Sequence, residues 1–226
     1  MHPQMIHLGS VGKTSIDIDI SFLIIMGLFV ATFYNQTMGL RYALLWAPVL
    51  FLSVLLHELA HAGAIAAFGY GGSQIVLSGM GGVTMNQRRA RPWHDMIISA
   101  AGPASSFILA WLTTMVMLNV GAASRDPLLN AFLPLLRTAN VWWGVFNLIP
   151  VVPLDGGHIV RNFLRMFMRD RLAFILSAWI AMVIGTLIVA LGIYIHFYFL
   201  SLLIAWYVWL AFQQWQFFRK GGPPAE

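Results

Sequence analysis

The sequence contains no cysteine, and charged residues make up only 9% of its 226 positions. The absence of cysteine excludes disulfide bonds and thiolate metal sites. The scarcity of charge sets the chain apart from ordinary globular domains, of which about 25% is charged. At the same time 59% of the residues are hydrophobic, more than a soluble fold of this length could bury. The composition therefore predicts a polytopic membrane protein.

The net charge of +5 is small and scattered along the chain. This distribution fits the loops of a membrane protein better than a surface for nucleic acid, so no nucleic-acid partner is expected. The segment 1–14 lacks the basic region, short apolar core and cleavage site of a secretory signal. We therefore expect no cleavable signal peptide.

Long apolar stretches alternate with short polar ones, and a helix needs about 20 mostly apolar residues to cross a bilayer. The pattern predicts an all-α polytopic membrane protein with about six transmembrane helices, near residues 20–38, 42–68, 96–120, 133–154, 172–192 and 194–212. The last two come from one apolar stretch divided near Gly192, and a single bent helix is the alternative. We expect one domain over residues 1–220, followed by a short flexible tail at 221–226.

Two segments have the character of strands. Ile16, Ile18 and Ile20 alternate with polar residues, which is the period of a half-buried strand. The segment 74–84 carries β-branched residues interrupted by glycines, which predicts a short strand or a hairpin with a bulge, although a flexible loop is an alternative. These segments predict a small membrane-associated β element.

Basic residues divide unequally between the two sides of the six-span arrangement. Ten fall in loops on one side and three on the other. The positive-inside rule then places both termini in the cytoplasm. We expect a multi-pass protein of the cell (inner) membrane.

The second predicted span contains the motif His57-Glu58-Leu-Ala-His61. On a helix the two histidines lie at i and i+4, so both imidazoles project from one face and can bind one zinc ion. Glu58 is the candidate general base for a water molecule. The motif lies in the cytoplasmic half of its span in the six-span arrangement.

A catalytic zinc commonly takes three protein ligands and leaves one position for water. Of the eight acidic residues, only Glu58 and Asp155 lie within or at the end of an apolar span away from obvious loop charge. Asp155 is therefore the candidate third ligand. An aspartate in a helix-ending turn and ligation by His158 are the alternatives.

The pairing of HELAH with Asn147-Leu-Ile-Pro-Val-Val-Pro-Leu-Asp-Gly-Gly157 resembles the site-2 protease family of intramembrane zinc metalloproteases. The segment 101–106 is similar to the GxxxN/S/G element of that family, with Ser106 at the last position. The resemblance covers residues 15–160 and corresponds to a minimal core without a PDZ or CBS domain.

The resemblance implies one zinc ion bound by His57, His61 and Asp155, with Glu58 as general base. Asn147 would hold the substrate or stabilise the oxyanion, and a bond to a neighbouring backbone at the Pro150 kink is the alternative. Gly79, Gly81 and Gly82 would lie in a β element that pairs with an unwound substrate. The implied substrates are single-span membrane proteins, such as membrane-tethered anti-sigma or transcription factors.

Three other functions could involve an HExxH motif or a set of histidines. A metalloprotease with a distant glutamate ligand fails because the only later glutamate is Glu226, and seven scattered histidines do not suit a di-iron oxidase. A zinc-binding transporter or scaffold without chemistry remains the alternative. Glu58 favours the enzyme, because a simple ion site needs no base beside its ligands.

Overall fold

The structure is a computed structural model that describes residues 5–34, 39–86, 88, 90–121 and 126–220. The chain divides into two compact units, whose segments interleave along the sequence. Unit 1 comprises Met1–Arg88 and Ala101–Val145, and unit 2 comprises Arg89–Ala100 and Phe146–Glu226. The tail predicted at 221–226 lies outside the described residues. The single domain over 1–220 stays a prediction.

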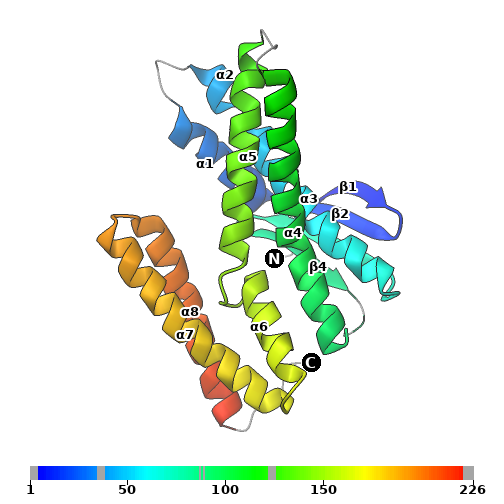
Figure 1. The fold of residues 1–226 in the computed structure, drawn as a ribbon, viewed down its shortest axis with the longest axis vertical. Coiled ribbons are helices and arrows are strands. Elements are labelled where there is room, and N and C mark those ends of the chain that lie inside the picture. Colours follow the sequence, from blue (N-terminus) through cyan, green and yellow to red (C-terminus); the bar gives the residue numbers. More distant parts are fainter. Residues whose placement is uncertain (1–4, 35–38, 87, 89, 122–125, 221–226) are drawn as a thin grey trace. The chain divides into compact units, whose positions relative to one another are not determined.

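Unit 1 contains a four-stranded sheet, drawn from blue to cyan-green in Figure 1. Its strands follow one another in chain order: β1 (Met5–Val11), β2 (Thr14–Asp19), β3 (Ser73–Ser78) and β4 (Gly81–Asn86). β1 and β2 form one antiparallel pair, β3 and β4 form another, and β2 runs parallel to β3. A parallel pair requires a long crossover connection, and the helices between β2 and β3 supply it. The β element also contains a strand, β1, that was not predicted from the sequence.

Both predicted strand segments are present in the sheet. Ile16 and Ile18 of β2 pack with Ile75 and Leu77 of β3 in a buried core. Ile20 ends the alternation and begins a helix, as the span predicted near 20–38 requires, because the Asp19 carboxylate caps that helix by accepting a hydrogen bond from the Ser21 amide at 2.8 Å. The segment 74–84 is a regular hairpin.

Asp17 joins three strands of this sheet. Its carboxylate accepts a hydrogen bond from the Gln74 amide at 2.7 Å and lies 2.8 Å from the His7 ring. The bond from Gln74, and then that from His7, lowers the pKa of Asp17 below its usual value.

We predict that Asp17 makes the stability of unit 1 sensitive to acid. A carboxylate whose pKa is lower in the folded state stabilises the fold above its unfolded pKa of about 3.9, and this contribution disappears as the pH falls through the folded pKa. Thermal unfolding of the purified protein below about pH 4 should therefore show a steeper loss of stability than in Asp17→Asn. Parallel acid profiles for the two proteins would contradict this role.

The helices of unit 1 include α1 (Ile20–Phe33), α2 (Leu40–Ala43) and α3 (Trp46–Ala67). α4 (Pro92–Val116) continues into a short π-helical turn, η1 (Met117–Gly121), and is followed by α5 (Pro127–Asn147). α4 and α5 each begin in one unit and end in the other. α4 and α5 lie in two of the long apolar stretches that were predicted to cross the membrane.

Three helical segments of the described residues are long and apolar enough to cross a membrane: Leu40–Ala67, Pro92–Asn119 and Asp170–Tyr194. They confirm the spans predicted near 42–68, 96–120 and 172–192. The protein is therefore an integral membrane protein by the character of these helices, and half of the six predicted spans are supported.

The other three predicted spans differ from the structure. The first is the 14-residue apolar helix α1, about 21 Å long at 1.5 Å per residue, and residues 35–38 lie outside the described part of the chain. The fourth was predicted to reach residue 154, but α5 ends at Asn147 and turns follow. Pro150 and Pro153 explain that end, because proline provides no amide donor for a helix.

Unit 2 contains α6 (Asp155–Arg165), α7 (Asp170–Tyr194) and α8 (Tyr198–Arg219). α7 and α8 pack along each other as a helical hairpin (Figure 1). The helices separate at residues 195–197 rather than at Gly192, and Gly192 instead lies against the Ser201 hydroxyl. The sixth predicted span is α8, which is 22 residues long but less apolar near its end. The alternative of one bent helix is wrong.

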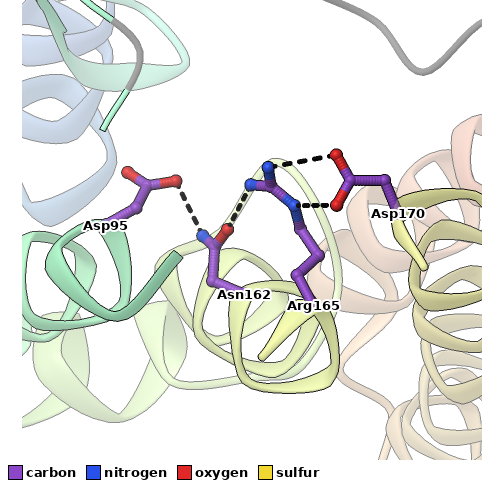
Figure 2. A network of polar contacts seen from close by, with 4 residues as sticks. All are labelled: Asp95, Asn162, Arg165 and Asp170. Atoms are coloured by element: carbon purple, nitrogen blue, oxygen red, sulfur yellow. Dashed lines mark hydrogen bonds and ion pairs between the residues drawn. The ribbon is translucent and has the colours of Figure 1, made fainter. Parts of the chain in front are cut away.

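The amphipathic helix α6 was not predicted, and a polar network fixes it within unit 2 (Figure 2). Asn162, fully buried, donates a hydrogen bond to Asp95 at 2.7 Å and accepts one from Arg165 at 2.8 Å. Arg165 also forms an ion pair with Asp170 at the start of α7, at 3.1 Å. The network thereby ties α6, whose first residue is Asp155, to α7 and to the beginning of α4.

Candidate functional site

The HExxH motif lies in the second half of α3, with all three of its polar side chains buried. His57, Glu58 and His61 are exposed by only 2%, 4% and 7%. The two imidazole rings lie 4.9 Å apart between centroids, as the i and i+4 spacing requires. One ring nitrogen of each lies within 4.8 Å of the other. Two buried imidazoles at this separation can share a single metal ion.

Gly102 on α4 shows that the imidazoles face a space kept free of side chains. A Cβ at position 102 would lie 2.5 Å from Nε2 of His57 and closer still to Nε2 of His61. Any other residue would therefore fill the position between the two nitrogen atoms. The two imidazole donors and the missing side chain both fit a zinc ion bound through Nε2 of each histidine.

Ser106, one turn further along α4, contacts the other nitrogen of His57. Its hydroxyl lies 3.1 Å from Nδ1 of His57 and is itself buried, at 1% exposure. A hydrogen bond at Nδ1 fixes the ring orientation and leaves Nε2 for a metal. The sequence marked the segment 101–106 only by its similarity to the GxxxN/S/G element. In the structure, Gly102 faces both histidines and Ser106 contacts His57.

We predict that Ser106→Ala weakens zinc binding without unfolding the protein. Loss of a partner of this kind commonly reduces metal affinity by about 10- to 100-fold. Competition with a chromophoric chelator measures the affinity in detergent. Ser105→Ala is the matched control, because the Ser105 hydroxyl bonds only the Gly102 carbonyl of its own helix among the contacts described, at 2.7 Å. Equal affinities for the two variants would contradict the role of Ser106.

Glu58 points toward strand β4. Thr84 donates from Oγ1 to Oε2 of Glu58 at 2.7 Å. A Cβ at Gly82 would overlap the Glu58 carboxyl group. Thr84 was not predicted from the sequence as a residue of this site. The available signal was the strand period, which places residues 82 and 84 on the same face of β4.

The three glycines predicted to bind substrate lie against other parts of unit 1. Gly79 approaches Ser21, Gly81 faces the ring of Trp143, and Gly82 faces Glu58. Gly81 has a φ of +112°, a conformation that residues with side chains rarely adopt. These contacts explain why the hairpin needs glycine. Substrate binding by the three glycines stays a prediction.

Asp155 and Asn147 belong to unit 2. Asn147 is the last residue of α5 and Asp155 the first residue of α6. Between them the chain folds tightly on itself, since a Cβ at Gly156 would overlap the Leu148 carbonyl and one at Gly157 would overlap the Val152 amide. The glycines therefore permit the turn that begins α6 at Asp155. His158, the alternative ligand, has its Nδ1 at 2.6 Å from Arg161.

Comparison with known proteins finds relatives named zinc metalloproteases. A model of peptidase family M50 matches residues 115–192. A protein of Mycobacterium tuberculosis named zinc metalloprotease Rip3 is 31% identical over 225 residues, covering 94% of this chain and 56% of that protein. Zinc metalloprotease MJ0392 of Methanocaldococcus jannaschii is 36% identical over 128 residues, covering 54% of this chain and 36% of its own. The chain thus spans about half the length, or less, of the curated relatives it matches.

A solved structure extends the agreement to the fold. The site-2 protease from Methanocaldococcus jannaschii aligns with a TM-score of 0.62 and 26% identity, covering 93% of this chain and 95% of that one. An HExxH motif on a helix is typical of zinc metalloproteases, in which the two histidines bind the metal and the glutamate serves as general base. The chain therefore carries a domain of peptidase family M50, the site-2 protease family. The cofactor of this class is zinc.

Proposed function

We propose that this protein is an intramembrane zinc endopeptidase that cleaves single-span membrane proteins within or near their transmembrane segments. The observation that carries this proposal is a carboxylate at 4% exposure, Glu58, between two buried histidines on an apolar helix of spanning length. A charged carboxylate at the centre of a span costs about 2.5–3.5 kcal/mol on insertion scales. Chemistry at the site explains why such a group is kept there.

We take Asp155 as the third zinc ligand. Asp155 is the acidic residue that elimination leaves, and unit 2 presents its carboxylate at the start of a helix. Asp155 opens α6 after a tight turn, and the buried network of Asn162 holds the helix. A carboxylate ligand completes the two imidazoles and leaves one coordination position for water. On this arrangement Asp155→Ala lowers zinc content, whereas a turn aspartate would not affect it.

The residues of the chain then have distinct roles in peptide hydrolysis. Zinc, when bound, supplies a Lewis acid that activates water and polarises the scissile carbonyl. Glu58 accepts the proton of the attacking water and passes it to the leaving amine. Asn147 donates a hydrogen bond to the oxyanion or to the substrate backbone. Gly102 keeps the space between the imidazoles open.

A helical substrate must unwind before its carbonyl groups can react, because its backbone hydrogen bonds are internal. Glycine and proline lower that cost, being about 1 and 3 kcal/mol less favourable than alanine in a helix. The outer edge of β4 has no strand beside it in the described sheet, so it offers backbone partners to an unwound segment. Suitable substrates are membrane-tethered anti-sigma or transcription factors with a helix break on the cytoplasmic side.

The proposed location is the cell (inner) membrane with both termini in the cytoplasm. The uneven distribution of basic residues supports this orientation. It places His57 and His61 in the cytoplasmic half of their span, where the path for water is short.

One experiment tests the function directly. The protein is reconstituted in lipid, its zinc is quantified, and it is incubated with a panel of single-span proteins, including one whose span is rebuilt from leucine and alanine. We expect one zinc per chain and cleavage that favours spans with a helix break. Folded protein without stoichiometric zinc would overturn the proposal. Bound zinc without cleavage of any substrate would favour the transporter or scaffold.

A further inference from the structure

Strand β4 presents two residues to Glu58 from the same face. Thr84 Oγ1 lies 2.7 Å from Oε2 of the carboxylate and 3.2 Å from the backbone oxygen of Glu58. Gly82, two residues earlier, leaves the space that the carboxyl group occupies. Val83 and Met85, which alternate with Gly82 and Thr84 along the strand, project from the opposite face and are about half exposed. The inner face of β4 is therefore shaped to receive the Glu58 side chain.

The pairing with β3 gives this face a firm support. Gly82 is paired with Leu77 and Thr84 with Ile75, and both partners are fully buried. Directly opposed residues of an antiparallel pair project from the same face of the sheet. Leu77 and Ile75 belong to the core that also contains Val54 and Ala62 of α3. The Thr84 hydroxyl is thus held at a constant position relative to the helix that carries Glu58.

We propose that Thr84 is the positioning residue for the general base. This inference rests on the proposed function, in which Glu58 accepts the proton of water. A hydroxyl bound to Oε2 fixes the rotation of the carboxyl group and leaves Oε1, which lies over Gly82, as the proton acceptor. Without the hydroxyl, the carboxyl group turns freely and meets the water in a productive orientation less often.

The location of Thr84 links two parts of the reaction. β4 is an edge strand of the described sheet, and its outer edge is the proposed contact for an unwound substrate. The same strand therefore orients the substrate backbone and the general base. Thr84 acts through Glu58, so its loss reduces turnover rather than substrate affinity.

The test compares Thr84→Val, which keeps the shape, with Thr84→Ser, which keeps the hydroxyl. Cleavage of a single-span substrate in lipid is measured together with bound zinc. We expect kcat to fall by about 10- to 100-fold in T84V, the effect of losing a hydrogen bond to a charged group. KM and zinc content should stay the same, and T84S should regain most of the rate. Thr114→Val is the matched control, since the Thr114 hydroxyl bonds Ala110 O of its own helix at 2.8 Å.

A double variant separates this inference from the proposed function. If Thr84 acts through Glu58, T84V adds no further loss to the residual rate of E58Q. A wild-type protein that cleaves no single-span substrate would overturn the proposed function itself, whereas an E58Q protein that cleaves at the wild-type rate would exclude Glu58 as the base. An inactive E58Q protein with an unaffected T84V would overturn only the role of Thr84. The role of Thr84 would also be overturned by any of three other results. These are a raised KM at constant kcat, a folded but inactive T84S, and loss of zinc in both T84V and Thr84→Ala.

Discussion

Glu58→Gln is expected to abolish proteolysis while zinc remains bound. The substitution keeps the size of the side chain, and its amide oxygen still accepts the hydrogen bond from Thr84. The amide cannot take a proton from water at neutral pH. General base catalysis commonly contributes about 10²- to 10⁴-fold, so the cleavage rate should fall by at least that factor. Zinc content per chain and the rate on a single-span substrate in lipid are the two measurements.

His57→Ala provides the contrasting variant for this experiment. It removes a nitrogen donor and should lose both zinc and activity, whereas E58Q should lose activity alone. Cleavage by E58Q at the wild-type rate would exclude Glu58 as the base. Loss of zinc by E58Q would show that the carboxylate serves the metal site instead of the reaction.

Gly102→Ala is expected to destroy the metal site by a single methyl group. The added Cβ would overlap the Nε2 atoms of both His57 and His61. The rings can escape only by turning away, or α3 and α4 must separate, and either change ends the convergence of the two donors. We expect a loss of zinc affinity at least as large as the roughly 10- to 100-fold effect of altering a partner behind a ligand. Chelator competition and activity should fall together.

The control for Gly102→Ala is the same substitution at Gly63. A Cβ at Gly63, two residues after His61 on α3, meets nothing within 4 Å. Alanine is favoured over glycine inside a helix by roughly 0.5–1 kcal/mol, so Gly63→Ala should retain zinc and activity. Normal zinc affinity in Gly102→Ala would show that the backbone at position 102 does not approach the metal.

The sequence predicted the helices and strands well wherever apolar residues recur at the period of a helix or a strand. Three spans, the alternation in β2 and the hairpin of β3 and β4 were all predicted from apolar periodicity, because that pattern arises locally. The errors lie where proline or amphipathicity intervened. α5 ends early before Pro150, and α6 is too polar on one face to be recognised as a span.

In the candidate site, too, local features were predicted and long-range contacts were not. The motif HELAH predicted two imidazoles and a carboxylate on one helix, because the spacing of a helix is fixed by its own hydrogen bonds. Asp155, Asn147 and the three glycines were singled out from motifs, and their roles in binding zinc and substrate stay predictions. Thr84 and the contact of Ser106 with His57 could not be inferred, because each contact joins segments far apart along the chain.

By itself the sequence determined the class of the protein, its apolar helices and the spacing of its metal ligands, all of which depend on composition or on neighbours a few residues away. Only the tertiary structure decided which side chains surround those ligands. Gly102 lies opposite the imidazoles, Ser106 lies behind His57, and Thr84 holds Glu58. These contacts result from the packing of α3 against α4 and β4, and packing depends on where side chains of distant segments find space and hydrogen-bond partners.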